Sequence, residues 1–394
     1  MKILLVHNRY KLAGGEDTVF KNELELLESK GNQVRQFIKD NKEIDNYSIS
    51  EKVSLIGKTT YSRNSYLEIA KIFKDYKPDV CHIHNFFPLI SPSIFSACQD
   101  NKIPVIQTLH NYRLICPGAY LYRDGHICEE CSENGIYKSV KYGCYRESKL
   151  QTYTVARMIQ KNSEYSTWNT KIDGYITLTN FAKQKFIQNN FPKNKIYKKS
   201  NFLFEDPGVS KRNVSGFIFV GRLDETKGLD VLIQASRINN NFKINIAGDG
   251  PLKPKFPKDI NYLGLLNKEG VHENIKTSLA LIFPSVWYEG MPMTIIEAFA
   301  CGRPVIASNL GAMAEMIEDG KTGLLFEPGN AKDLANKMQW AMDNKDKMAE
   351  MGKNARKEFE EKYTAEKNYE RLMEIYRAAI DNARKKYALK ENEF

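Results

Sequence analysis

The sequence lacks several features that would assign it to a familiar class. No uninterrupted apolar stretch in its 394 residues approaches the roughly 18 residues of a membrane-spanning helix. Met1 to His7 reads as a short strand followed by polar residues, without the apolar core and small-residue cleavage site of a signal peptide. The three spaced glycines of a dinucleotide-binding fingerprint are absent after this strand, which argues against a nicotinamide-dependent enzyme. We therefore expect a cytoplasmic protein.

Acidic residues are scarce in part of the chain. The net charge is +10, and thirteen Lys or Arg residues face only three Asp or Glu residues between Ile136 and Ser200. Such an excess favours a polyanionic partner, such as a nucleotide phosphate, a lipid pyrophosphate or an anionic membrane, although solvated lysines are the ordinary alternative. No RNA- or DNA-reading motif accompanies the lysines, so we expect no nucleic-acid partner.

The chain is too long for one typical core, and its strand and helix signals alternate almost throughout. This pattern predicts an α/β protein of two doubly wound parallel sheets facing each other across a cleft, joined by a linker at Asn201–Ser215. The predicted domains are residues 1–205 and residues 206–369, and a helix at 370–394 is expected to return to the first domain. An irregular insertion at 112–148 interrupts the alternation in the first domain.

The most informative segment contains Glu289 and Glu297. An apolar strand, Leu279 to Pro284, leads into a Gly-Met-Pro turn, a helix that carries Glu297, and a second strand. Loops at the carboxyl ends of strands line the ligand crevice of a parallel sheet, and carboxylates there suit a ligand with many hydroxyls. The helix start near Pro292 favours an anion. A polyol beside an anion describes a sugar nucleotide, whereas each glutamate alone would more often be a solvated surface group.

Arg222 and Lys227 follow a candidate strand that lies earlier in the chain, Gly216 to Val220, and they precede a helix. A guanidinium and an ammonium beside a helix start suit a phosphate, although surface cations are common at such positions. Gly248 lies at another strand-to-turn junction, where it serves a tight turn or lets the backbone approach a ligand.

Two features of the first domain face the same predicted cleft. Gly14 and Gly15 lie in the loop after the first strand, where a tight turn is the structural alternative. His110 ends the strand that starts at Val105. A lone histidine is more often a structural hydrogen-bonding group, but its place at the end of a strand favours a role in the site.

Four of the seven cysteines lie in or beside the insertion, namely Cys116, Cys128, Cys131 and Cys144. Four thiolates suit a tetrahedral zinc ion, and a reducing compartment disfavours disulfides. The spacing departs from a standard zinc ribbon, so reduced free thiols remain the alternative. Cys81, Cys98 and Cys301 lie among apolar residues and are predicted to be core residues.

A basic and aromatic helix face is predicted at Lys149, Tyr153, Arg157, Lys161 and Tyr165, which recur at every fourth position. Such a face suits peripheral contact with a membrane or an acidic lipid carrier, and a solvated helix face is the alternative.

Taken together, these motifs resemble a retaining glycosyltransferase of family 4 (glycosyl transferases group 1), which has the two-domain GT-B fold. Glu289 and Glu297 match the E-x7-E motif of that family, and Arg222 and Lys227 match its diphosphate-binding Arg-x4-Lys pair. Gly14 and Gly15 match its glycine-rich first loop, and His110 its active-site histidine. The resemblance covers nearly the whole chain.

The resemblance implies a metal-independent transfer from a nucleotide sugar, a UDP- or GDP-sugar, and the sequence contains no Asp-x-Asp motif. Arg222 and Lys227 would stabilise the leaving diphosphate, Glu289 and His110 would contact the transferred sugar, and Glu297 would bind the ribose. These assignments make His110, Glu289, Arg222 and Lys227 the implied catalytic residues. The implied donor-binding residues are Gly14, Gly15, Arg222, Lys227, Gly248, Gly290, Met291, Pro292, Met293, Thr294 and Glu297.

Many relatives build bacterial surface polysaccharides at the inner face of the membrane, which implies a glycan or a polyprenyl-diphosphate-linked acceptor. Two other functions stay open. One is a nucleotide-sugar-binding subunit without turnover, and the other is a GT-B epimerase that acts on the nucleotide sugar itself.

Overall fold

The computed structural model describes residues 1–11, 14–210, 214–239, 241–252, 257 and 260–391. Contacts divide the chain into two compact units. The first unit contains Met1–Leu121, Cys128–Lys199 and the chain from Tyr369 onward, and the second contains Tyr122–Ile127 and Ser200–Asn368. Residues 211–213 of the predicted linker and residues 392–394 of the predicted last helix lie outside the described residues.

The first unit is built on a six-stranded sheet with the order β2-β1-β3-β4-β7-β8, and its neighbouring strands are all parallel. Its strands are β1 (Lys2–Arg9), β2 (Gln33–Asp40), β3 (Val80–Ile83), β4 (Val105–Leu109), β7 (Gly174–Thr177) and β8 (Ile196–Lys198). Strands β3, β4 and β7 are buried along their whole length, which explains their nearly continuous apolar sequences. The strand order reverses between β1 and β3, so the ligand crevice of this sheet is expected at the carboxyl ends of these two strands.

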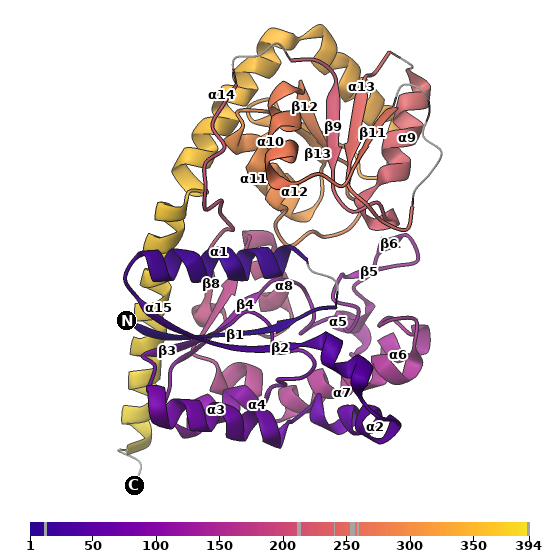
Figure 1. Ribbon diagram of the computed structural model, residues 1–394. Helices are drawn as coiled ribbons and strands as arrows, with labels where there is room; N and C mark the ends of the chain where they lie inside the picture. The colour runs from indigo at the N-terminus through magenta and orange to yellow at the C-terminus, as the bar shows by residue number, and fades with distance from the viewer. Residues whose placement is uncertain (12–13, 211–213, 240, 253–256, 258–259, 392–394) are drawn as a thin grey trace. The chain divides into compact units, whose positions relative to one another are not determined.

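Helices cover this sheet and connect its strands. They are α1 (Gly15–Ser29), α2 (Ile49–Lys58), α3 (Arg63–Tyr76), α4 (Ser93–Asp100), α5 (Glu130–Asn134), α6 (Lys138–Tyr142), α7 (Lys149–Glu164) and α8 (Asn180–Gln188), with short helical turns η1 (Asn41–Asn46), η2 (Thr167–Lys171) and η3 (Lys193–Lys195). The last helix, α15 (Ala365–Glu391), packs on the first unit, as Figure 1 shows. Its buried residues Leu372, Tyr376 and Ala379 share one core with Ile3 and Leu5 of β1. This finding confirms the predicted return of the chain to its first domain.

The predicted insertion has little regular structure. A two-stranded hairpin, β5 (Tyr122–Arg123) and β6 (His126–Ile127), precedes the short helices α5 and α6. Contacts group Tyr122–Ile127 with the second unit, whereas the sequence analysis assigned the whole stretch 112–148 to the first domain.

The second unit repeats the design of the first with the strand order β11-β10-β9-β12-β13-β14, again with parallel neighbours. Its strands are β9 (Phe217–Val220), β10 (Ile244–Ala247), β11 (Ile260–Gly264), β12 (Ala280–Phe283), β13 (Val305–Ser308) and β14 (Gly323–Phe326). Its helices are η4 (Glu225–Lys227), α9 (Leu229–Ile238), α10 (Lys268–Thr277), α11 (Met293–Ala300), α12 (Gly311–Met316), α13 (Ala331–Asp343) and α14 (Lys345–Lys362). Here the order reverses between β9 and β12.

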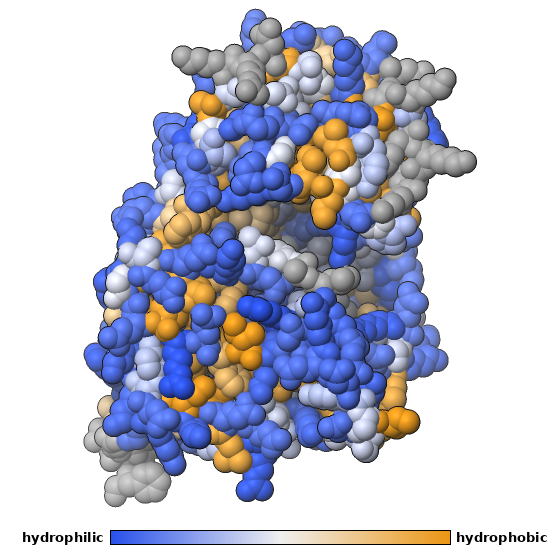
Figure 2. Space-filling view, viewed as in Figure 1, coloured by the Kyte–Doolittle hydropathy of each residue, from blue (hydrophilic) through white to orange (hydrophobic). Residues whose placement is uncertain are grey.

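The visible surface is largely hydrophilic, with apolar side chains in small scattered groups (Figure 2). Among the described residues, no helix combines the length and the apolar character needed to cross a bilayer.

Candidate functional site

The second sheet brings two of the predicted motifs to its point of reversal. β9 and β12 are hydrogen-bonded neighbours, and each runs into a loop that carries predicted site residues. Arg222 and Lys227 follow β9, and Glu289 follows β12. Because the carboxyl ends of parallel strands lie at the same edge of the sheet, the two loops meet there.

Glu289 lies at the centre of this meeting point, and only 5% of its surface is exposed. Lys227 Nζ lies 2.7 Å from its Oε1, and the same oxygen accepts hydrogen bonds from Ser285 Oγ at 2.7 Å and Trp287 Nε1 at 3.0 Å. The Lys227 ammonium also lies over the Trp287 ring, 5.5 Å from its centroid. Three donors on one oxygen fix the orientation of the carboxylate before any ligand binds.

Arg222 is held by a different carboxylate. Its Nε donates to Asp224, which also accepts from Thr226 Oγ1 at 2.6 Å and from the backbone N–H of Lys227 at 3.2 Å. Burial opposes ionisation of Asp224, but the hydrogen bond from Thr226 and the Arg222 charge outweigh it and lower the pKa of Asp224. Because the side chain of Arg222 is 56% exposed, its guanidinium can meet a ligand while Asp224 holds its position.

Glu297 lies in a separate environment, on α11. Burial raises the pKa of this carboxyl to about 7, and the Lys268 charge opposes that shift. His272 Nε2 lies 3.9 Å from Glu297 Oε1. The structure therefore joins Arg222, Lys227 and Glu289 through a chain of contacts, and it gives Glu297 neighbours from α10.

The residues between the two glutamates form the start of α11. Pro292 precedes the helix, whose first residues are Met293 and Thr294. The first N–H groups of a helix have no acceptor within it and suit an anion. Asn201 Nδ2 donates to the carbonyl oxygen of Met291 at 3.2 Å, which ties the preceding turn to the start of the second unit.

The structure explains one predicted glycine by close packing. Gly248 has a φ of +145°, and a Cβ at this position would lie 1.8 Å from the carbonyl oxygen of Gly221. The turn after β10 therefore requires glycine for its own geometry. Gly14 and Gly15 differ, because a Cβ at either position would meet nothing within 4 Å.

A cavity of 360 Å³ in the first unit is lined by residues on both sides of Gly14 and Gly15 in the sequence, among them Lys11 and Asp17. Arg9, Lys11, Lys21 and Lys42 contribute cationic side chains to its lining, and Asp17 and Asp40 contribute carboxylates. The Gly14 backbone N–H donates to Asp17 Oδ2 at 2.8 Å, which caps the start of α1.

His110 directly follows β4 and is partly exposed. Its Nε2 lies 3.0 Å from Nδ1 of His84, a buried residue that directly follows β3. Burial, followed by the neighbouring His84 and His7, lowers the pKa of His110 well below its ordinary value. His110 is therefore a neutral imidazole near pH 7, able both to donate and to accept a hydrogen bond.

The four cysteines of the insertion are neighbours, since burial and then the thiols of Cys116, Cys144 and Cys128 raise the pKa of Cys131 to about 12. Among the described residues, only Glu23, His82 and His84 bring three potential metal-ligand atoms within 4.8 Å of one another. No three of the four thiols therefore lie within that limit of one another, and the zinc site stays a prediction. Cys81, Cys98 and Cys301 are buried, as predicted.

The predicted basic and aromatic face on α7 is not uniformly turned outward. Arg157 donates to Thr60 Oγ1 at 3.2 Å and thereby joins α7 to the end of α2. Lys161 pairs with Glu164 at 2.7 Å, and the exposed ring of Tyr153 stacks on Tyr137. Part of this face therefore serves the structure of the first unit.

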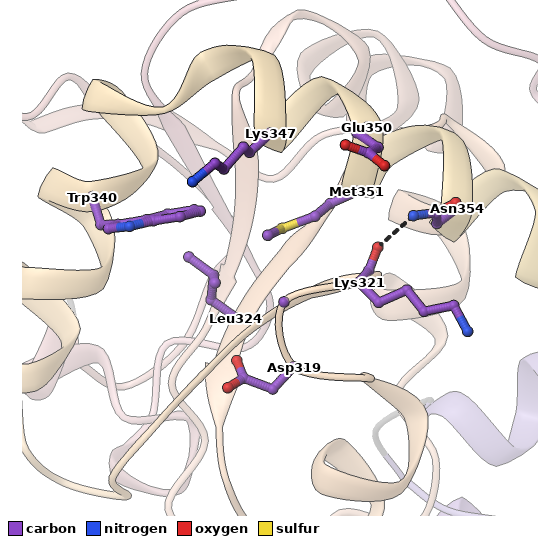
Figure 3. A pocket seen from close by; sticks show the side chains of 9 residues that line it. Asp319, Lys321, Leu324, Trp340, Lys347, Glu350, Met351 and Asn354 are labelled. Carbon is purple, nitrogen blue, oxygen red and sulfur yellow. Dashed lines mark hydrogen bonds between the residues drawn. The ribbon is translucent and has the colours of Figure 1, made fainter.

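A separate cavity of 460 Å³ contains none of the predicted site residues (Figure 3). It lies in the second unit between β14, α13 and α14, with Trp340, Leu324 and Met351 among its lining residues. Lys347 lies over the Trp340 ring, 5.4 Å from its centroid. Because the point of strand reversal lies at β9 and β12, this cavity belongs to another part of the sheet.

Comparison with known proteins identifies the second unit. Residues 205–358 match the family model described as Glycosyl transferases group 1. The chain therefore contains a Glycosyl transferases group 1 domain. This domain includes the Arg222, Lys227, Glu289 and Glu297 motifs.

Relatives extend over most of the chain. It is 26% identical over 383 residues to a poly(ribitol-phosphate) alpha-N-acetylglucosaminyltransferase of Staphylococcus aureus, covering 89% of this chain and 75% of the relative. It is also 26% identical over 372 residues to an uncharacterised 41.2 kDa protein in the cps region of Klebsiella pneumoniae, covering 86% and 89%.

A solved structure supports the architecture. Anabaena HepE in complex with UDP-glucose matches with a TM-score of 0.66 at 16% identity, over 95% of this chain and 98% of that one. With two Rossmann-like parallel sheets in the chain, this likeness confirms the predicted GT-B fold.

Sequence reasoning missed several partners within the glycosyltransferase domain and outside it. Ser285 and Trp287 lie between the predicted strand that ends at Pro284 and the Gly-Met-Pro turn, yet their contact with Glu289 depends on how the loop folds. The first unit adds Glu23, His84 and Lys199. A signal for His84 was present, because His82 and His84 are two positions apart at the end of a strand and so share one face.

Proposed function

We propose that the chain is a retaining, metal-independent glycosyltransferase. It transfers a sugar from a UDP- or GDP-sugar to a glycan or polyprenyl-diphosphate-linked acceptor, in the biosynthesis of a bacterial surface polysaccharide. The named relative from S. aureus is a poly(ribitol-phosphate) alpha-N-acetylglucosaminyltransferase, which supports sugar transfer to a glycan acceptor that contains phosphate. The neighbour from Anabaena was solved in complex with UDP-glucose, which supports a nucleotide sugar as the donor.

One observation carries this proposal: Lys227 and Glu289 form an ion pair, 2.7 Å apart, where the strand order of the second sheet reverses. The pair places a cation for a phosphate directly beside an oriented carboxylate for a sugar hydroxyl. Arg222 adds a second cation on the same loop, held by Asp224.

The proposed chemistry follows from these charges. Breaking the bond between the sugar and the diphosphate develops negative charge on the leaving oxygen, which Arg222 and Lys227 stabilise electrostatically. Departure and attack on the same face of the sugar retain its configuration, and Glu289 holds the sugar through hydroxyl hydrogen bonds. The first N–H groups of α11, at Met293 and Thr294, bind the diphosphate, and Glu297 binds the ribose.

On the first domain, Gly14 and Gly15 leave room for the donor, since nothing lies within 4 Å of a Cβ there. We place the acceptor in the cavity beside this loop, where Arg9, Lys11, Lys21 and Lys42 suit an acceptor that carries phosphate. Synthesis on a lipid-linked acceptor implies work at the inner face of the membrane, and the exposed side chains Lys149 and Tyr153 of α7 would contact it.

The experiment is a transfer assay with a panel of radiolabelled UDP- and GDP-sugars and a lipid-linked or phosphate-containing glycan acceptor. Wild-type protein should transfer one sugar with retention, without added metal and in the presence of a chelator. Glu289→Gln should abolish transfer. Lys357→Ala, at an exposed ion pair on α14, is the matched control and should keep full activity.

The two alternatives give different results in the same assay. A binding subunit would bind a donor without any turnover, which would refute the transferase proposal. An epimerase would change the sugar nucleotide in the absence of an acceptor, and analysis of the nucleotide products would reveal it.

A further inference from the structure

The first domain contains a buried row of polar side chains that ends at His110. We call Glu23, His84 and His110 the histidine relay. Its first two members are 0% and 2% exposed, and only His110 reaches the surface. Glu23 comes from α1, His84 follows β3, and His110 follows β4, so three separate segments of one domain build it.

The charge of Glu23 is fixed by its neighbours. Lys199 Nζ lies 2.8 Å from Glu23 Oε2, and both side chains are at most 2% exposed. Burial alone would raise the pKa of Glu23, but the Lys199 ammonium, followed by His82 and His84, outweighs it and holds this pKa well below its ordinary value. Glu23 is thus a carboxylate, which accepts hydrogen bonds and cannot donate them.

His84 lies between Glu23 and His110 and contacts both. Its Nε2 lies 3.0 Å from Glu23 Oε1 and its Nδ1 lies 3.0 Å from Nε2 of His110. Burial lowers the pKa of His84 to about 3 despite the Glu23 charge, so the ring carries a single proton near neutral pH. Since Oε1 only accepts, that proton lies on Nε2, and Nδ1 of His84 is left with a lone pair.

The hydrogen bond between the two rings then has one possible direction. Because Nδ1 of His84 accepts, Nε2 of His110 must donate. A neutral His110 has no second ring proton, so its Nδ1 is an unprotonated acceptor.

We propose that Glu23 and His84 are positioning residues that lock His110 in its Nε2–H tautomer, so that His110 offers Nδ1 as an acceptor. Under the proposed function, on which this consequence rests, Nδ1 accepts a hydrogen bond from a hydroxyl of the transferred sugar and thereby orients that sugar. His110 therefore does not act as a general acid in the relay.

A metal ion is the competing occupant, because donor atoms of Glu23, His82 and His84 all lie within 4.8 Å of one another. The structure disfavours it. Lys199 already supplies a buried cation to Glu23. His82 Nδ1 lies 2.9 Å from Glu23 Oε1 and 2.8 Å from Tyr376 Oη, and its Nε2 lies 2.7 Å from Thr108 Oγ1. A metal would have to displace these contacts and stand beside the Lys199 ammonium.

The test is long-range ¹⁵N–¹H correlation spectroscopy of the whole protein labelled at its six histidines, with His110 assigned by its loss in His110→Gln. The shifts of the two ring nitrogens report the tautomer directly and need neither donor nor acceptor. We expect the Nε2–H tautomer in the wild type. An Nδ1–H tautomer or an imidazolium at pH 7 would overturn the proposal, as would His82 and His84 signals that move on addition of one equivalent of Zn²⁺.

Variants then separate positioning from a structural role. Glu23→Gln replaces an obligatory acceptor with an amide that also donates, so the His110 spectrum should change to a mixture of tautomers. Thr108→Val is the control, because it removes the contact at His82 Nε2 and leaves the 2.9 Å contact of His82 Nδ1 with Glu23 in place. It should leave the His110 signals unchanged. If Glu23→Gln alone does not fold, the double variant Glu23→Gln/Lys199→Met removes the unpaired buried ammonium and serves instead. An unchanged His110 tautomer in either folded variant contradicts the relay.

Activity gives a second reading. Partners that orient a functional histidine typically change activity by about 10- to 100-fold, so Glu23→Gln should lower kcat by that factor and Thr108→Val should not. If the Nε2–H tautomer is observed but no donor supports turnover, the proposed function is refuted and the histidine relay is still supported. If turnover is observed but His110 is the Nδ1–H tautomer, the relay is refuted and the proposed function is still supported.

Discussion

Lys227 and Glu289 are 62 residues apart in the sequence, yet the ammonium nitrogen of the first lies 2.7 Å from a carboxylate oxygen of the second. The contact joins the loop after β9 to the loop after β12. It pairs a group expected to bind phosphate with a group expected to bind sugar, so each orients the other in the ligand-free protein.

Removing the phosphate-binding cations should slow turnover more than it weakens donor binding. Arg222→Ala removes a charge that acts mainly on the developing negative charge of the diphosphate, so we expect kcat to fall by about 10²- to 10³-fold. Steady-state kinetics with the best donor measure it. Arg222→Lys should restore little, because an ammonium does not reproduce the planar fork of the guanidinium. Near-native rates in Arg222→Ala would show that the phosphate assignment is wrong.

Donor affinity should rise with pH through the ionisation of Glu297. The pKa of this carboxyl is raised to about 7 by burial, and the ionised form accepts two hydrogen bonds from ribose hydroxyls where the protonated form accepts fewer. Calorimetric titration with UDP or GDP should therefore give tighter binding at pH 8 than at pH 6. Glu297→Gln should flatten this dependence, and an equally steep profile in the variant would refute the role of Glu297.

The same shift has a consequence for the ligand-free protein. Between its unfolded pKa near 4.5 and its folded pKa near 7, Glu297 holds a proton only in the native state. Its contribution to stability is therefore present at low pH and is lost as the pH rises through this window. Relative to the wild type, Glu297→Gln should gain stability from pH 5 to pH 8 in urea unfolding.

Substitution by alanine should destabilise the protein at Gly248 and leave its stability almost unchanged at Gly14. Gly248→Ala places a Cβ 1.8 Å from the carbonyl oxygen of Gly221 at a φ of +145°, and we expect a loss on the order of 3 kcal/mol in the free energy of unfolding. Gly14→Ala meets open space and should change stability by less than about 0.5 kcal/mol. If Gly14 borders the donor, its variant should still bind donor more weakly. A Gly14→Ala protein with native stability and native affinity would remove that loop from the site.

Elemental analysis tests the zinc prediction for Cys116, Cys128, Cys131 and Cys144. Protein purified without chelator should contain one zinc per chain, and Cys131→Ser should lose it. Binding would also release the proton that the raised pKa of Cys131 otherwise retains. Protein free of zinc, with four titratable thiols, would establish that these cysteines are reduced.

The sequence allowed the fold and part of the site to be predicted, for a physical reason. Buried parallel strands are short apolar runs, and functional groups gather where such runs end, so Arg222, Lys227, Glu289 and His110 could be placed from their order in the chain. Contacts that depend on how a loop folds, or on segments far apart in the sequence, could not be predicted in this way. Lys199 meets Glu23 across 176 residues, and Asp224 holds Arg222 through a local turn that only coordinates reveal.

The insertion was harder still. It has positive-φ glycines, such as Gly125, Gly135 and Gly143, but also positive-φ residues of other types, such as Ala119 and Leu121, so ordinary turn signals mark only part of its path. Its hairpin was assigned to the first domain by position in the chain, whereas contacts group it with the second.

The packing of α15 determines the order in which the protein can be completed during synthesis. The core of the first domain needs Leu372, Tyr376 and Ala379, which leave the ribosome after the entire second domain. Until then Ile3 and Leu5 of β1 lack their packing partners on α15. The first domain, although it is synthesised first, therefore completes its core last. A fragment that ends before α15 should accordingly be a substrate for chaperones and proteases, even though its sheet is complete.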